Sequence, residues 1–321
     1  MAYSYYKVRL KLSVYHKMGT YFLFFVNIFT ALEKKSYLCT DKLCLHYQYV
    51  QAIEQNSAHE AAGISIEALS IGYAGARNTP HTVAEGLSCE AHKGMLTALL
   101  GANGEGKSTL LRTIAGLQPA LEGTVRIDGK PIGTLTPRRR ATMVATVLTE
   151  RPHTLYCTAW EMAATGRSPY TGFWGRLSDD DRRAVDEALR EAGVSEQLAQ
   201  KPFARMSDGE RQKVLIARAL AQQTPVIVLD EPTAFLDYTS KVGIMRLLRR
   251  LAHTAGKTIL LSTHDVELAL QTADTLWMMH RGTIKAGSPD ALAADGTLQD
   301  FIAPSGATLD TTRLTVTVNR S

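Results

Sequence analysis

The stretch best suited to chemistry is a glycine-rich turn that follows an apolar run, Met95 to Leu100. The turn reads GANGEGKST over residues 101–109, and its spacing, Gly-x4-Gly-Lys-Ser, is that of a loop that cradles phosphates. Glycines let successive backbone N–H groups point at phosphate oxygens, and the start of the next helix adds partial positive charge. The stretch predicts a nucleoside triphosphate site, with an accidental glycine turn as the alternative.

Side chains in and before this turn have distinct tasks in such a site. We expect Lys107 to reach the outer phosphates and Ser108 to place its hydroxyl on Mg²⁺. Tyr73, between predicted strands at 64–71 and 82–89, could stack on the base, which is worth about 1–3 kcal/mol. A half-buried tyrosine at a strand end is the alternative for that residue. The other loop residues expected to contact the nucleotide are Gly101, Asn103, Gly104, Gly106 and Thr109.

Two adjacent carboxylates, Asp230 and Glu231, follow the unbroken apolar run at residues 225–229. A strand buried on both faces would deliver them to the carboxyl edge of a parallel sheet, where ligands bind. Asp230 suits Mg²⁺, usually through water, and Glu231 can face a water aimed at the γ-phosphate. A further buried strand, Thr258 to Ser262, ends just before His264, which could donate a hydrogen bond to the γ-phosphate. Such a pair of charges seldom has a purely structural purpose.

Residues 150–205 look more helical and more polar than the rest, with helical spacing at 159–165 and 179–192. The intervening stretch at 166–175 is rich in turn residues and aromatics. It forms either a small satellite core or a surface that docks on a partner, and the sequence leaves both open. Beyond it, Ser207 is well placed to cap a following helix, which by itself indicates an ordinary amphipathic helix.

The composition narrows the classes of protein that fit. The chain has 321 residues, of which 45% are hydrophobic and 21% charged, as in ordinary globular proteins. A net charge of +5 is too small to indicate nucleic acid as a partner. The nine histidines are scattered, so we expect no metal beyond nucleotide-bound Mg²⁺. The cysteines have no metal-binding spacing, which favours reduced thiols; they are Cys39, Cys44, Cys89 and Cys157.

Residues 1–62 differ in character from the rest of the chain. Their aromatic run at residues 21–29 is shorter than the roughly 20 residues of a spanning helix and lacks a small-residue cleavage site. We predict a disordered or dispensable N-terminal extension, followed by one domain over residues 63–321. An interfacial membrane anchor and a packed structural element are the alternatives for this extension.

Taken in order, these motifs resemble those of the ATP-binding-cassette (ABC) transporter ATPases over about residues 64–300. The phosphate loop, the helix opening MSDGE, the strand VIVLDEP, the turn AFLD and the segment THD match in order and spacing. The segment GRSPYTGFWGRLSDDD and the short tail are most similar to importer ATPases for metal chelates such as iron–siderophore, haem and cobalamin. The resemblance implies an α/β P-loop NTPase fold with a mostly parallel core sheet, an antiparallel β subdomain and a helical subdomain at about 150–205.

The resemblance also implies a mechanism and partners. Two copies would form a homodimer that holds each ATP, with Mg²⁺, between the phosphate loop of one copy and the MSDGE segment of the other. Ser207 and Gly209 would contact the γ-phosphate across the interface, Glu231 would polarise the attacking water, His264 would steady the γ-phosphate, and Asp237 would couple the two sites. ATP hydrolysis would drive an integral-membrane permease, served by a periplasmic or surface binding protein, with no nucleic acid involved.

The same resemblance predicts a peripheral position at the cytoplasmic face of the inner (plasma) membrane. An exporter ATPase, and a soluble ABC ATPase that does not transport, are the alternative functions. A small-molecule kinase shares the phosphate loop, but that class does not explain MSDGE or the terminal histidine.

Two departures from the family pattern affect the site. Asp208 and Glu210 stand where the family usually has glycine and glutamine, and we expect Asp208 to point away from the triphosphate. The glutamine that normally reaches the metal falls on Thr149, with Glu150 next. Thr149 is the aligned metal residue but is short, so we expect Glu150 or a water to substitute for it.

Overall fold

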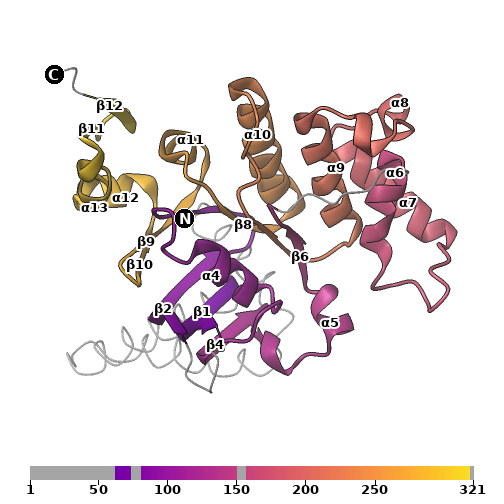
Figure 1. Ribbon diagram of the computed structural model, residues 1–321, viewed down its shortest axis with the longest axis horizontal. Helices are drawn as coiled ribbons and strands as arrows, with labels where there is room; N and C mark the ends of the chain where they lie inside the picture. The colour runs from indigo at the N-terminus through magenta and orange to yellow at the C-terminus, as the bar shows by residue number, and fades with distance from the viewer. Residues whose placement is uncertain (1–61, 74–80, 150–156, 319–321) are drawn as a thin grey trace, which may run out of the picture. The chain divides into compact units, whose positions relative to one another are not determined.

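The structure is a computed structural model that describes residues 62–73, 81–149 and 157–318, and Figure 1 traces these segments. Of the predicted extension at 1–62, Ala62 alone belongs to the described part of the chain, and the first strand begins there. Glu150 also lies outside the described residues. The predictions made for the extension and for Glu150 therefore stay predictions.

The centre of the molecule is a six-stranded sheet with the order β10-β9-β3-β8-β7-β6. Strands β6, β7, β8, β3 and β9 are parallel, and β10 pairs with β9 in an antiparallel hairpin that turns at Arg281-Gly282. Its central parallel strands are buried on both faces, which explains their unbroken apolar sequences. The strands are β3 (Leu96–Leu100), β6 (Val144–Val147), β7 (Val226–Leu229), β8 (Thr258–Ser262), β9 (Thr275–His280) and β10 (Thr283–Gly287).

A second sheet has four antiparallel strands in the order β2-β1-β4-β5. Apolar side chains from this sheet, from α4 (Lys107–Ile114) and from one face of the central sheet form a common core, which includes Ile64, Leu110 and Trp277. The predicted strands at 64–71 and 82–89 are both present and longer than expected. The strands are β1 (Ala62–Tyr73), β2 (His81–His92), β4 (Glu122–Ile127) and β5 (Lys130–Pro131).

Helices cover the opposite face of the central sheet. Neighbouring strand residues alternate between the two cores, so that Leu99 belongs to the core with α4 and Leu100 to the core with the helices. The helical segments predicted at 159–165 and 179–192 are α6 and α7. The helices are α6 (Ala159–Ala164), α7 (Asp179–Glu191), α8 (Glu196–Ala199), α9 (Asp208–Ala221), α10 (Tyr238–Ala255) and α11 (Val266–Thr272).

Short elements complete the chain. The arginine run at 138–140 lies on α5 (Pro137–Ala141), where Arg138 and Arg139 are exposed to solvent. Ser288 caps the short helix α12 (Pro289–Ala294), which has proline at its first position. Sequence patterns did not predict the elements beyond α12, namely α13 (Thr297–Ile302) and an antiparallel hairpin of β11 (Ala307–Asp310) and β12 (Thr315–Val318).

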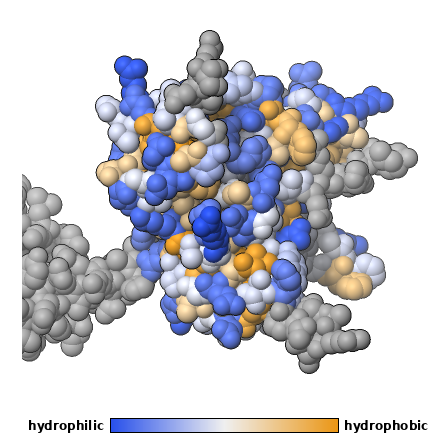
Figure 2. Space-filling view, turned by 60° about the vertical axis from the view of Figure 1, so that its left-hand side comes forward, coloured by the Kyte–Doolittle hydropathy of each residue, from blue (hydrophilic) through white to orange (hydrophobic). Residues whose placement is uncertain are grey.

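Within the described ranges, no helix combines the length and the apolar character needed to cross a membrane. On the face seen in Figure 2, hydrophobic residues occur in small patches among hydrophilic ones. This mixture is common on the water-exposed surface of folded domains.

Candidate functional site

The phosphate loop connects β3 to α4. Gly104 and Gly106 have φ values of 87° and 100°, a left-handed backbone that favours glycine. A Cβ atom on Gly106 would lie 2.4 Å from Cγ1 of Val83, so a larger residue does not fit there. The glycines thus allow both the bend of the loop and its close approach to the antiparallel sheet.

Lys107 folds back over the loop that precedes it. Its ammonium group donates hydrogen bonds to the backbone oxygens of Gly101 over 2.7 Å and Ala102 over 3.0 Å. Burial lowers the pKa of Lys107, and the carboxylates of Glu231 and Asp230 oppose this shift. A phosphate chain in the loop would offer the ammonium group stronger, charge-assisted bonds than these carbonyls do.

The acidic pair lies beside the phosphate loop. Asp230 is only 5% exposed, and its Oδ1 accepts a hydrogen bond of 3.1 Å from Oγ of Ser108. Strands β3 and β7 both flank β8 in the parallel sheet, so the segments that come after them meet at one edge. The structure thereby brings together two groups that the sequence indicated separately.

Ser262 is a site residue that sequence reasoning missed. It is fully buried at the end of β8. Its hydroxyl donates to Oδ1 of Asp230 over 2.7 Å and accepts a hydrogen bond of 2.9 Å from the backbone N–H of Glu231. The Ser262 side chain is therefore hydrogen-bonded to both Asp230 and Glu231. The available signal was a hydroxyl at the end of an otherwise apolar run, two positions before His264.

Glu231 and His264 lie close together at the same edge of the sheet. Nδ1 of His264 is 3.4 Å from Oε2 of Glu231, and both side chains are partly exposed. The backbone of Glu231 has φ of 48°, which is uncommon for a residue with a side chain. This pair is placed to meet a group that enters from solvent, and its catalytic roles remain predictions.

Thr149 follows β6 and lies next to Asp230. Its hydroxyl donates a hydrogen bond of 3.0 Å to the backbone oxygen of Asp230. The side chain is thus engaged with the main chain of the acidic segment, and its role as a metal ligand remains a prediction. The bond links the end of β6 directly to the end of β7.

Tyr73 lies at the end of β1, and 49% of its surface is exposed. Its hydroxyl shares a hydrogen bond of 2.7 Å with the hydroxyl of Thr109, in the first turn of α4. The ring therefore stands next to the phosphate loop, where a base could reach it. Stacking on the nucleotide remains a prediction for this residue.

The MSDGE segment forms the start of α9. The hydroxyl of Ser207 accepts from the backbone N–H of Glu210, whose carboxylate in turn accepts from the backbone N–H of Ser207. Lys201 also donates to Glu210, and both contacts hold the pKa of this carboxyl below its usual value. Asp208 pairs with Arg211 over 3.4 Å. Asp208 and Glu210, the two residues that depart from the family pattern, thus both make contacts at the start of α9.

Asp237 caps α10, because its carboxylate accepts hydrogen bonds from both the backbone and the hydroxyl of Ser240. These bonds lower the pKa of Asp237. A Cβ on Gly209 would lie 3.1 Å from Oγ of Ser240, so the starts of α9 and α10 are neighbours. Ser207 and Gly209, at the start of α9, therefore lie near Asp237 at the start of α10. Helix α4, which follows the phosphate loop, packs on the opposite face of the central sheet from α9.

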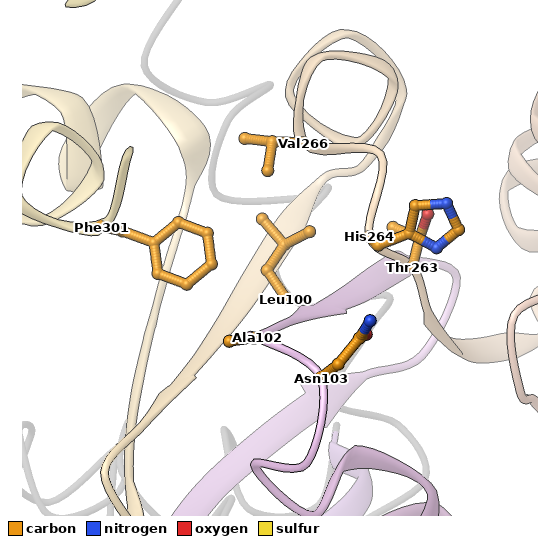
Figure 3. Close-up of a pocket in the computed structure, with 8 residues that line it drawn as sticks. Leu100, Ala102, Asn103, Thr263, His264, Val266 and Phe301 are labelled. Atoms are coloured by element: carbon orange, nitrogen blue, oxygen red, sulfur yellow. The ribbon is translucent and has the colours of Figure 1, made fainter. Parts of the chain in front are cut away.

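A pocket of about 260 Å³ opens beside the start of the phosphate loop (Figure 3). Phe301 of α13 lies on one side of it, and Asn103 and His264 lie on the other. Its full lining is Leu100, Gly101, Ala102, Asn103, Thr263, His264, Val266 and Phe301.

Comparison with known proteins identifies the family of this chain. The sequence model of the ABC transporter family matches residues 84–234. An uncharacterised ABC transporter ATP-binding protein of Methanocaldococcus jannaschii is 42% identical over 71% of this chain and 77% of its own length. The chain belongs to the ABC transporter ATP-binding proteins.

Other relatives of this ABC ATPase have more specific names. The iron(3+)-hydroxamate import ATP-binding protein FhuC of Bacillus subtilis is 37% identical over 69% of this chain and 80% of its own. An inward-facing metal-chelate type ABC transporter structure has 26% identity and a TM-score of 0.63, over 75% of this chain and 89% of that chain. The dimeric structure of the ATP-binding cassette MJ0796 bound to ADP and Pi has 27% identity and a TM-score of 0.61, over 70% of this chain and 98% of that chain.

These findings confirm three predictions from the sequence. The chain is an ABC ATPase, it has the α/β fold of that family, and its relatives include importer subunits for metal chelates. The roles assigned to individual residues remain predictions.

Proposed function

We propose that this ABC ATPase is the ATP-hydrolysing subunit of an importer that takes up a metal chelate, such as an iron–siderophore, haem or cobalamin. A separate integral-membrane permease would carry the cargo, and a periplasmic or surface binding protein would deliver it. The named importer relatives support this direction of transport over an exporter or a non-transport ATPase. The protein would then lie peripherally at the cytoplasmic face of the inner (plasma) membrane.

The single observation that carries the catalytic part is the contact of Ser108 with Asp230, with Ser262 bridging to Glu231. Hydroxyl and carboxylate oxygens are the ligands that Mg²⁺ prefers, so Ser108 and Asp230 fit this ion directly or through water. Mg²⁺ would neutralise charge on the β- and γ-phosphates when bound. The oxygen atoms at this edge of the central sheet are thus suited to bind a nucleoside triphosphate together with its metal ion.

The chain's own residues supply the remaining chemistry. Glu231 would orient and polarise the attacking water, because its carboxylate is partly exposed and its backbone is fixed by Ser262. His264, 3.4 Å away, would donate a hydrogen bond to the γ-phosphate. Lys107 would exchange its bonds to loop carbonyls for bonds to phosphate oxygens.

The positions of Ser207 and Gly209 favour a homodimer. Gly209 lies in the first turn of α9 and Ser207 caps this helix, which packs on the face of the central sheet opposite to α4. We therefore expect that a single chain does not bring its MSDGE segment to its own phosphate loop. Two copies arranged head to tail would provide both halves to each ATP. A dimeric cassette among the structural neighbours supports this arrangement.

The aromatic segment at 166–175 fits a surface for the permease better than a satellite core. Phe173 and Trp174 are 96% and 83% exposed, and their rings meet edge to face with centroids 5.5 Å apart. The buried ion pair of Arg167 with Asp181 anchors the start of the segment. Exposed aromatic rings are typical anchors of protein interfaces.

Purification of the Glu231→Gln variant from membranes of its own host, with ATP present, tests this function. We expect an integral-membrane protein to co-purify in a stable complex, because the ATP-bound state cannot turn over. Proteoliposomes that contain both proteins should accumulate an iron–siderophore, haem or cobalamin when ATP is supplied on the side of the ATPase. Co-purification of ribosomes or DNA, or export of the cargo, would contradict the proposal.

A further inference from the structure

The phosphate loop, GANGEGKST, contains one acidic residue, Glu105. A carboxylate in such a loop repels the phosphates that bind there, so its charge by itself disfavours the ligand. The side chain is nevertheless held close to the protein, with only 19% of it exposed. The catalytic roles proposed above do not involve Glu105, so its position calls for another explanation.

The turn between β9 and β10 holds the Glu105 carboxylate. Its Oε2 accepts a hydrogen bond of 2.8 Å from the backbone N–H of Arg281, and its Oε1 lies 3.7 Å from Nδ1 of His280. Arg281 and Gly282 have φ values of 49° and 74°, as in a two-residue hairpin turn. Because His280 pairs with Thr283 across the hairpin, the Arg281 N–H lies at the tip, where pairing of the two strands does not use it.

The same hairpin contacts the glycines of the phosphate loop and the antiparallel sheet. A Cβ atom on Gly101 would lie 2.9 Å from the backbone oxygen of Met279, and one on Gly106 would lie 3.3 Å from Cε of Met279. A Cβ atom on Gly282 would lie 3.8 Å from Cα of Ala84 in β2, and Figure 1 shows the hairpin beside this strand. Strand β2 pairs with β1, whose last residue is the tyrosine expected at the base. The hairpin therefore links the phosphate end of the site to the sheet that carries its base end.

We propose that Glu105 is a positioning residue, which fastens the phosphate loop to the β9–β10 turn and thereby raises the affinity for ATP. This inference rests on the ATP site of the proposed function. The bond to Arg281 holds the loop in its bent form before the nucleotide arrives, so that less ordering is needed on binding. It also directs the carboxylate to the hairpin tip, and the gain from a fixed loop exceeds the repulsion that the charge causes.

The first test uses the fact that anchoring and charge predict changes of opposite sign. Titration of the full-length protein with a fluorescent ATP analogue gives the dissociation constant. Glu105→Ala removes the anchor together with the charge and should raise this constant about 10-fold, because a charge-assisted hydrogen bond is lost. Glu105→Gln removes the charge but keeps an acceptor oxygen, and should bind at least as tightly as the wild type.

Two further variants serve as controls in the same titration. Glu105→Ser has a side chain that is also too short to reach the turn, and should weaken binding as Glu105→Ala does. Glu85→Ala removes an exposed carboxylate from β2 and should leave the dissociation constant unchanged. Circular dichroism verifies the fold of each variant.

Steady-state ATP hydrolysis separates positioning from catalysis. Glu105→Ala should raise KM for ATP while kcat stays unchanged, because the loop binds the phosphates in the ground state and the transition state alike. The residues expected to act on the attacking water and the γ-phosphate, Glu231 and His264, have no contact with the β9–β10 turn among the described interactions. Restoration of KM by Glu105→Gln would identify the acceptor oxygen as the group that matters.

Hydrogen–deuterium exchange followed by mass spectrometry detects the contact itself. Overlapping peptides that begin before and after Arg281 report the exchange of its amide. This exchange should be faster in Glu105→Ala than in the wild type, because the amide loses its acceptor, and should remain slow in Glu105→Gln.

Three outcomes overturn the inference. They are an equal or lower dissociation constant for Glu105→Ala, an equal loss of affinity in Glu105→Gln and Glu105→Ala, and unchanged exchange of the Arg281 amide in Glu105→Ala. Failure of the wild type to bind the ATP analogue would instead remove the ATP site itself. Failure confined to the Glu105 variants leaves the proposed function intact.

Discussion

Ser262 donates a hydrogen bond of 2.7 Å to Oδ1 of Asp230 from a fully buried position at the end of β8. The same hydroxyl accepts a hydrogen bond from the backbone N–H of Glu231. Asp230 is the predicted metal ligand and Glu231 the predicted base, so the geometry of both depends on one oxygen atom. Ser262 acts in this arrangement as a positioning residue.

We expect Ser262→Ala to lower kcat for ATP hydrolysis by about 10-fold or more while KM for ATP changes little. The variant leaves the Glu231 N–H without its acceptor, which costs about 1–3 kcal/mol for a buried group. Steady-state phosphate release measures both constants. Ser262→Thr keeps the hydroxyl and should retain most of the rate. A fully active Ser262→Ala would show that the bridge has no catalytic purpose.

Lys107→Ala should weaken ATP binding by at least about 10-fold. The lysine is placed to donate charge-assisted hydrogen bonds, each worth about 1.5–3 kcal/mol. Titration with a fluorescent ATP analogue measures the affinity, and circular dichroism verifies the fold. Unchanged affinity would mean that the ammonium group stays on Gly101 and Ala102 when nucleotide binds.

Glu231→Gln should retain ATP binding and lose most ATP hydrolysis, because the amide cannot polarise the attacking water. Single-turnover measurement of phosphate release separates the chemical step from binding. The neighbouring His264→Ala should also slow hydrolysis, since it lies 3.4 Å from Glu231. Normal turnover by Glu231→Gln would assign the base to another residue.

Asp181→Asn should lower the free energy of unfolding at pH 7 by about 3 kcal/mol, because the Arg167 charge stays buried without a carboxylate beside it. Hydrogen bonds from Ser178 and from Arg167 lower the pKa of Asp181 from 3.8 to about 2. The carboxylate therefore stabilises the fold above pH 3.8, and this stabilisation is lost as the pH falls toward 2. Urea unfolding should show the two proteins converging across that window. A constant difference down to pH 2 would contradict this assignment.

Removal of the first 60 residues, so that the chain begins at Ala61, should leave the melting temperature and the ATPase rate unchanged. The described fold begins at Ala62, where β1 enters its sheet. Calorimetry and phosphate release on both lengths test this. Loss of folding or of activity on truncation would identify the extension as part of the working protein.

Local patterns were enough to predict the phosphate loop, the acidic pair and the strands that carry them. Gly106 and Asp230 are recognisable because their chemistry depends on residue type and on neighbours along the chain. Ser262 and the pocket residue Phe301 were not recognisable, because their roles come from strand order and from packing between distant segments. The contact of Ser108 with Asp230 spans 122 positions and became visible only in the assembled sheet.

The apolar wall of the pocket has one further consequence. Phe301 lies on α13, beyond residues 84–234 that the family model matches. A group that enters the pocket meets the phosphate loop on one side and this tail residue on the other. What the pocket accepts beside the phosphates is therefore determined in part by a segment outside the matched region.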